Sequence, residues 1–88
     1  MRDIDTLLKM AEPIQPNISL LREYRKLANS KQFLDNSTNS KNKLFGMLRF
    51  LLDAKANGEN IDKYSEEFNL ILEIVDIVYE VDVSMLYY

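Results

Sequence analysis

Residues 68–88 read FNLILEIVDIVYEVDVSMLYY, and the interpretation of this stretch decides the fold. It is the most apolar part of the chain and the richest in β-branched residues, but acidic residues interrupt it. A membrane-spanning helix needs about 20 predominantly apolar residues, and each charge near its centre costs several kcal/mol. Because Glu73, Asp76, Glu80 and Asp82 lie within ten positions of one another, the sequence does not predict a membrane span here.

A β-strand is the second interpretation of this stretch. Valine and isoleucine favour strands, and residues 79–83 (YEVDV) alternate between apolar and acidic side chains. No other segment has a comparable run of β-branched residues, so a strand here would lack a partner for its backbone hydrogen bonds. Pairing with a second copy across a dimer would supply that partner, and this alternative stays open for residues 79–83.

A helix explains the spacing of the acidic residues. Polar side chains recur at steps of four and three from position 62 to position 80, so a helix places them in one narrow line between two apolar flanks. These polar residues are Asp62, Glu66, Asn69, Glu73, Asp76 and Glu80. A helix with so thin a polar line is mostly enclosed by its neighbours. We therefore predict a long, mostly buried C-terminal helix over residues 60–85.

The rest of the chain predicts three further helices, over residues 3–12, 18–34 and 40–56, with a polar loop at 35–41. Each predicted helix carries apolar residues at intervals of three and four. Two glycines and two prolines are too few for an all-β fold with many tight turns. The sequence therefore predicts a single all-α domain over residues 1–88, a small three- to four-helix bundle.

Single residues mark the expected ends of these helices. Pro13 and Pro16 end the first helix and leave an extended connector whose Ile14 is expected to reach the core. Asn17 is the expected N-cap of the second helix, and Gly58 is expected to follow the end of the third. Gly46 lies inside the third helix, where a glycine allows a neighbouring helix to approach closely.

The residue types available restrict the chemistry of the chain. It has neither cysteine nor histidine, which excludes disulfides, thiolate metal sites, cysteine nucleophiles and the commonest general base. There is no glycine-rich phosphate loop. We therefore predict no catalytic, cofactor-binding or metal-binding residues. The N-terminus carries acids and lacks an apolar run of signal-peptide length, so a cytoplasmic protein is expected.

Charge is divided unevenly along the sequence. Residues 1–57 carry ten Lys and Arg against six Asp and Glu, whereas residues 58–88 carry only Lys63 against eight acids. One interpretation is internal complementarity, in which basic helices pack beside an acidic one. The other is a binding surface, because a continuous line of carboxylates steers a basic partner. Direct nucleic-acid binding is disfavoured by the net charge of −3, although Arg22, Arg25, Lys26 and Lys31 form a basic group.

Three hypotheses for function follow. In the first, the chain is a small acidic protein that binds a protein with a basic surface, such as a nucleic-acid-binding protein. Its small size, acidic helix and abundant Asn and Lys are typical of accessory proteins from phages and mobile elements, and an inhibitor or adaptor of that kind is expected. The second is a structural or assembly role through homodimerisation of the C-terminal helix. The third is a carboxylate metal-binding bundle, for which the usual Glu-x-x-His pairs are missing. The candidate partner-binding residues are Asp62, Glu66, Glu73, Asp76, Glu80, Tyr87 and Tyr88.

Overall fold

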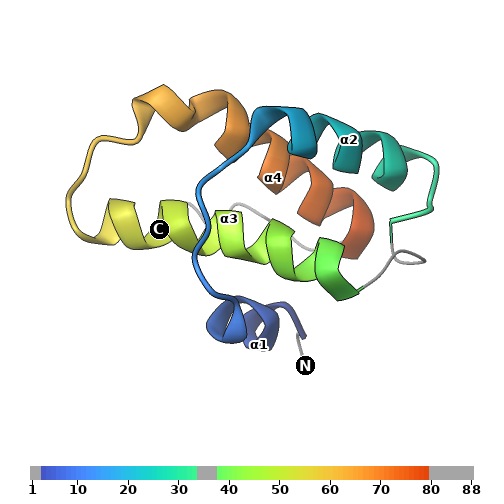
Figure 1. The fold of residues 1–88 in the computed structure, drawn as a ribbon, viewed down its shortest axis with the longest axis horizontal. Helices are drawn as coiled ribbons and strands as arrows, with labels where there is room; N and C mark the ends of the chain where they lie inside the picture. The colour runs from blue at the N-terminus through green and yellow to red at the C-terminus, as the bar shows by residue number, and fades with distance from the viewer. Residues whose placement is uncertain (1–2, 34–37, 80–88) are drawn as a thin grey trace.

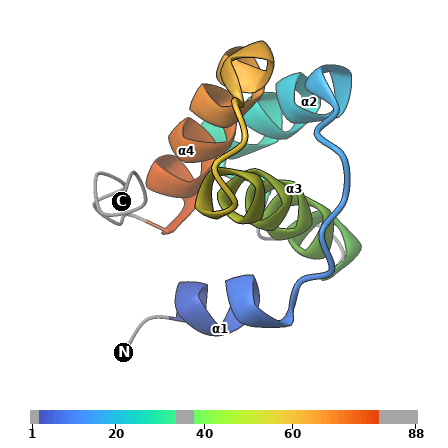
Figure 2. The same cartoon turned by 90° about the vertical axis from the view of Figure 1, so that its left-hand side faces the viewer.

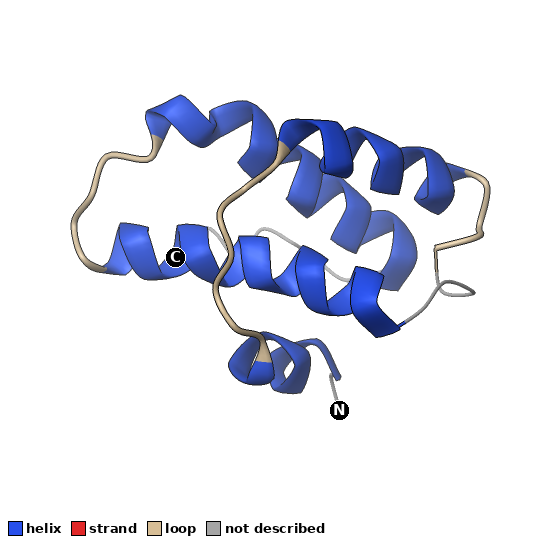
Figure 3. Ribbon diagram, in the orientation of Figure 1, coloured by secondary structure: helices blue, strands red, loops and turns tan. Residues whose placement is uncertain are grey.

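The computed structural model describes residues 3–33 and 38–79, and every regular element in these ranges is helical (Figure 3). Its elements are α1 (Asp3–Met10), α2 (Ile18–Asn29), α3 (Thr38–Ala56), a 3₁₀ turn η1 (Asp62–Tyr64) and α4 (Ser65–Tyr79). The predicted all-α class is therefore confirmed. Within the described ranges, each helix is too short or too polar to cross a membrane.

α3 occupies the middle of the arrangement (Figure 1). α2 and α4 pack against each other on one side of it, and α1 packs on the opposite side (Figure 2). The core between these helices is apolar and contains no buried charged side chain among the described residues. Its largest fully buried side chains are Phe33, Phe45, Leu21, Leu44, Met47, Leu48, Leu51, Ile71, Ile74 and Val75.

α4 has the amphipathic pattern that its sequence predicts. Its buried residues are Phe68, Leu70, Ile71, Leu72, Ile74 and Val75. The polar residues between them, Glu66, Asn69, Glu73 and Asp76, are exposed. The helical interpretation is therefore right for Ser65–Tyr79, and residues 80–83 of the strand alternative lie outside the described residues. The helix begins later than the predicted residue 60, because η1 forms the preceding turn. With 15 residues, the described α4 is shorter than the 19-residue α3.

The predicted end of the second helix at residue 34 is wrong, because α2 ends at Asn29. Lys31 adopts a left-handed conformation with φ of 61°. Its N–H donates to the carbonyl of Ala28 at 3.1 Å, and the N–H of Gln32 donates to the carbonyl of Leu27 at 2.8 Å. These two bonds form a Schellman motif, which closes the helix and turns the chain. Phe33 then returns to the core.

α3 begins at Thr38, inside the predicted loop 35–41, and ends at the predicted residue 56. Its end has the predicted glycine: Gly58 has φ of 80° and donates to the carbonyl of Lys55 at 3.0 Å. Gly46 permits a close approach, as expected, but from the connector that follows α1 rather than from a helix. A Cβ at Gly46 would lie 2.6 Å from the carbonyl oxygen of Glu12.

α1 ends at Met10, two residues before the predicted end. Glu12 precedes Pro13, and the proline ring disfavours helical conformation at the residue before it. The side chain of Ile14 packs against the core, as predicted, and its N–H donates to the carbonyl of Gly46 at 3.1 Å. Arg49 completes the attachment, because its Nη1 donates to the carbonyls of Leu8 and Lys9 in the last turn of α1.

Candidate partner-binding surface

The acidic line, defined as Asp62, Glu66, Glu73, Asp76 and Glu80, is described up to Asp76. Asp62 lies in η1, and the next three lie on the exposed face of α4. The remaining candidates Glu80, Tyr87 and Tyr88 lie outside the described residues. The structure therefore describes four of the seven predicted site residues, one on η1 and three on α4.

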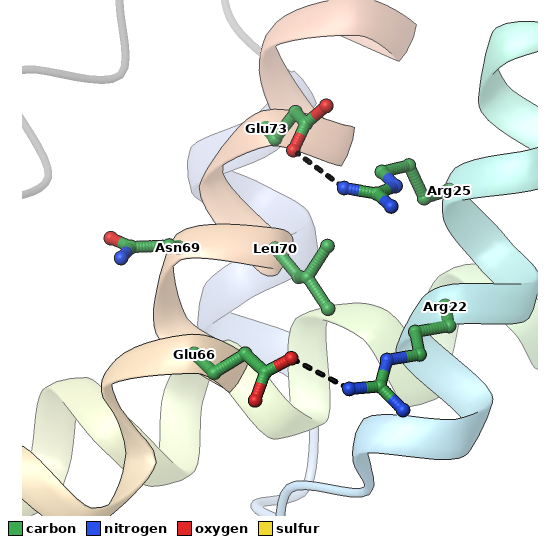
Figure 4. Close-up of a pocket in the computed structure, with 6 residues that line it drawn as sticks. All are labelled: Arg22, Arg25, Glu66, Asn69, Leu70 and Glu73. Atoms are coloured by element: carbon green, nitrogen blue, oxygen red, sulfur yellow. Dashed lines mark hydrogen bonds and ion pairs between the residues drawn. The ribbon is translucent and has the colours of Figure 1, made fainter.

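Two members of the acidic line bind arginines of α2. Arg22 Nη2 lies 2.7 Å from Glu66 Oε2, and Arg25 Nη1 lies 3.5 Å from Glu73 Oε1 (Figure 4). Residue numbers rise together along both helices in these pairs, so α2 and α4 run in the same general direction. Since 44% to 62% of each side chain is exposed, each pair contributes at most about 1 kcal/mol. The internal complementarity suggested by the charge distribution is present at these two positions.

The side chains around these ion pairs form a shallow groove of about 210 Å³ between α2 and α4. The buried Leu70 forms its floor between the two pairs, and Asn69 lies at its edge (Figure 4). The groove holds two cations and two anions, so its own charges balance. Such a surface offers hydrogen bonds and ionic contacts to a polar partner.

Asp62 and Asp76 differ from the two paired glutamates. Both are exposed, and neither forms an ion pair with a basic side chain in the described part of the chain. The N–H of Asp62 donates to the side-chain Oδ1 of Asn60 at 2.8 Å, and this hydrogen bond fixes the backbone at the start of η1. The neighbouring Lys63 turns its ammonium group toward the ring of Tyr64, 5.4 Å from its centroid. The carboxylates of Asp62 and Asp76 thus remain open to solvent.

The metal-binding hypothesis needs several acidic side chains close together. Over residues 3–33 and 38–79, no three acidic side chains lie close enough together to hold a metal ion. Glu73, which the sequence places one helical turn from Asp76, binds Arg25 instead.

Tyr79 carries a buried hydroxyl that the sequence pattern does not indicate. Tyr79 packs edge-on against Phe45, with ring centroids 5.5 Å apart. Its hydroxyl is buried and has no hydrogen-bond partner among the described residues, and burial raises its pKa. The hydroxyl of the buried Tyr24, in contrast, is hydrogen-bonded to Ser40. The sequence pattern marks both tyrosines only as members of apolar stripes.

Comparisons with protein-family models, with curated proteins and with solved structures gave no match to this chain.

Proposed function

We propose that this chain acts as a small inhibitor or adaptor that binds a protein with a basic surface along the edge formed by η1 and α4. One observation carries the proposal. α4 has four carboxylates and no basic side chain between Ser65 and Tyr79, and the arginines of α2 bind two of those carboxylates. The edge formed by η1 and α4 therefore keeps a net negative charge after its ion pairs are counted, because Asp62, Glu67 and Asp76 outnumber Lys63.

The physical effect of such an edge is on association. Exposed charges of one sign raise the encounter rate with an oppositely charged surface, and this effect falls with added salt. Nucleic-acid-binding proteins are one suitable partner class, because their basic surfaces are built to neutralise a line of phosphates. We also propose that the C-terminal helix is the long, mostly enclosed helix of the bundle. Its buried face then provides the rigid support that holds the acidic edge in place.

The test compares two charge-reversal variants with the same total charge. One carries Asp62→Lys and Asp76→Lys on the proposed edge, and the control carries Glu12→Lys and Glu23→Lys, which are exposed and lie outside η1 and α4. A partner is first isolated from the native host by cross-linking to the wild-type protein, and its association rate is then measured at several salt concentrations. We expect the edge variant to associate at least tenfold more slowly with a flatter salt dependence, and the control to lie closer to wild type. Equal rates for both variants would refute the proposal.

Homodimerisation remains a second candidate because of Ile77. This side chain is 36% exposed on α4, directly after Asp76. A second copy that covered Ile77 would bury apolar surface at the C-terminal end of α4. Sedimentation at high micromolar concentration tests this candidate with the wild-type protein and Ile77→Lys. A dimer that the substitution abolishes supports it, and a monomer in both samples rules it out.

A further inference from the structure

We propose that Asn57 is a site of spontaneous deamidation that unlocks the end of α3. Asn57 and Gly58 are both exposed in the turn that follows this helix. A glycine after asparagine is the pairing that allows this reaction most readily, because no side chain shields the attacking backbone nitrogen. A Cβ built on Gly58 would meet no atom within 4 Å, so the turn is open on that side. The inference is independent of the proposed partner-binding role.

The reaction requires only water. The backbone nitrogen of Gly58 forms a bond to the side-chain carbonyl carbon of Asn57, and the bond from that carbon to the side-chain nitrogen breaks. The proton of the attacking nitrogen leaves with the amide group as ammonia. Water then opens the resulting cyclic imide at one of its two carbonyls. The products are aspartate or isoaspartate at position 57, with one water consumed and one ammonia released.

The fold controls access to this reaction through the Schellman motif at the end of α3. The N–H of Gly58 donates to the carbonyl of Lys55, and the N–H of Glu59 donates to the carbonyl of Ala54, both at 3.0 Å. The nitrogen that must attack Asn57 is therefore bound to the last turn of the helix. It becomes available when this turn opens, and helix ends open more readily than helix interiors. The folded protein should therefore react, but more slowly than an unstructured peptide of the same sequence.

The isoaspartate product cannot restore the original turn. Isoaspartate adds one atom to the main chain between position 57 and Gly58, so the two hydrogen bonds of the motif no longer close in register. Both products also place a carboxylate at the C-terminal end of a helix, where the helix dipole is negative. The release of ammonia makes the change one-way, and the isoaspartate product loosens the segment that leads from α3 to Asp62 and α4.

The experiment follows the full-length protein during incubation at mildly alkaline pH, with peptide mapping by mass spectrometry. An isoaspartyl methyltransferase identifies the isoaspartate product. The reference is a synthetic peptide of residues 54–60, and the internal controls are Asn42 and Asn60, which are exposed but precede Lys43 and Ile61. We expect position 57 to convert in the folded protein more slowly than in the peptide, with the controls unchanged. An intact Asn57 after the peptide has fully converted overturns the proposal.

A second variant tests whether the last turn of α3 limits the rate of the reaction. Ala56→Gly weakens the last turn of α3, where Ala56 is exposed, and should raise the population of the open turn about fivefold. The conversion rate of the folded protein should rise by the same factor. The matching peptide with glycine at this position should convert at the rate of the original peptide. A folded-state rate unchanged by Ala56→Gly overturns the role assigned to the Schellman motif.

Discussion

Gly46→Ala should destabilise the protein, although the substitution improves helix propensity. Gly46 lies inside α3, where replacing glycine by alanine normally stabilises a helix by about 1 kcal/mol. Here the added Cβ would lie 2.6 Å from the carbonyl oxygen of Glu12 and 3.1 Å from Cγ1 of Ile14. The first of these atoms belongs to the backbone of the connector, so no side-chain rotation removes the contact.

The cost follows from how far the connector must move. A relaxed carbon–oxygen contact is about 3.3 Å, so the Glu12 carbonyl must retreat by about 0.7 Å. The N–H of Ile14 is held at 3.1 Å from the Gly46 carbonyl, and this hydrogen bond lengthens as the connector moves away. Overpacking of this kind costs about 1–3 kcal/mol, and the weakened hydrogen bond adds about 1 kcal/mol. After the gain in propensity, we expect a net loss of about 2 kcal/mol.

The assay is urea and thermal unfolding followed by circular dichroism. A loss of about 2 kcal/mol corresponds to a fall in Tm of about 8–16 °C for a domain of this size. The control is Asn42→Ala, an exposed position in the same helix, which should be neutral or slightly stabilising. If Gly46→Ala matches or exceeds the stability of the wild-type protein, the close approach of the connector does not exist as described.

Three further predictions concern single polar contacts. Arg49→Met removes the donor that binds the last turn of α1. The substitution should lower the free energy of unfolding by about 2 kcal/mol and speed hydrogen exchange selectively in α1. Tyr79→Phe should leave stability at neutral pH unchanged or raised, whereas Tyr24→Phe should cost about 1 kcal/mol, as unfolding measurements would show. Burial raises the pKa of both phenols above 10.0, so the unfolded chain ionises first and stability falls as the pH rises past 10.0; either substitution should reduce that loss. A double-mutant cycle for Arg22 and Glu66 should give a coupling below about 1 kcal/mol that salt reduces further, and a larger, salt-independent value would contradict the exposed pairing.

Local periodicity predicts the helices because burial selects residues at helical spacing. In α4, the buried Phe68, Ile71 and Val75 recur at steps of three and four with exposed polar residues between them, and that spacing favours the helix that the structure shows. The end of α2 could not be predicted in the same way. The residue in the left-handed conformation there is Lys31, and the sequence carries no glycine to mark it, unlike the end of α3 at Gly58.

The candidate site could be predicted in part for a similar reason. The carboxylates of the acidic line share a face because of spacing within one helix, which the sequence shows directly. Their pairing with Arg22 and Arg25 depends on how α2 lies against α4, which is a property of tertiary packing. One signal was available: both arginines flank the apolar stripe of α2, as the glutamates flank that of α4. Opposite charges beside two apolar stripes favour the pairing of those two helices.

The paired glutamates determine which charge reversals test the proposed function. A lysine at position 66 would face Arg22 at the position of a 2.7 Å ion pair, and the like charges would oppose the packing of α2 on α4. A loss of binding in that variant would then report on the fold as well as on the surface. Asp62 and Asp76 are exposed and bind no described basic side chain, so their reversal changes the field at the edge and leaves the helix contacts intact. Binding that depends on Glu66 and Glu73 but not on Asp62 and Asp76 would therefore assign the acidic line to the stability of the α2–α4 pair.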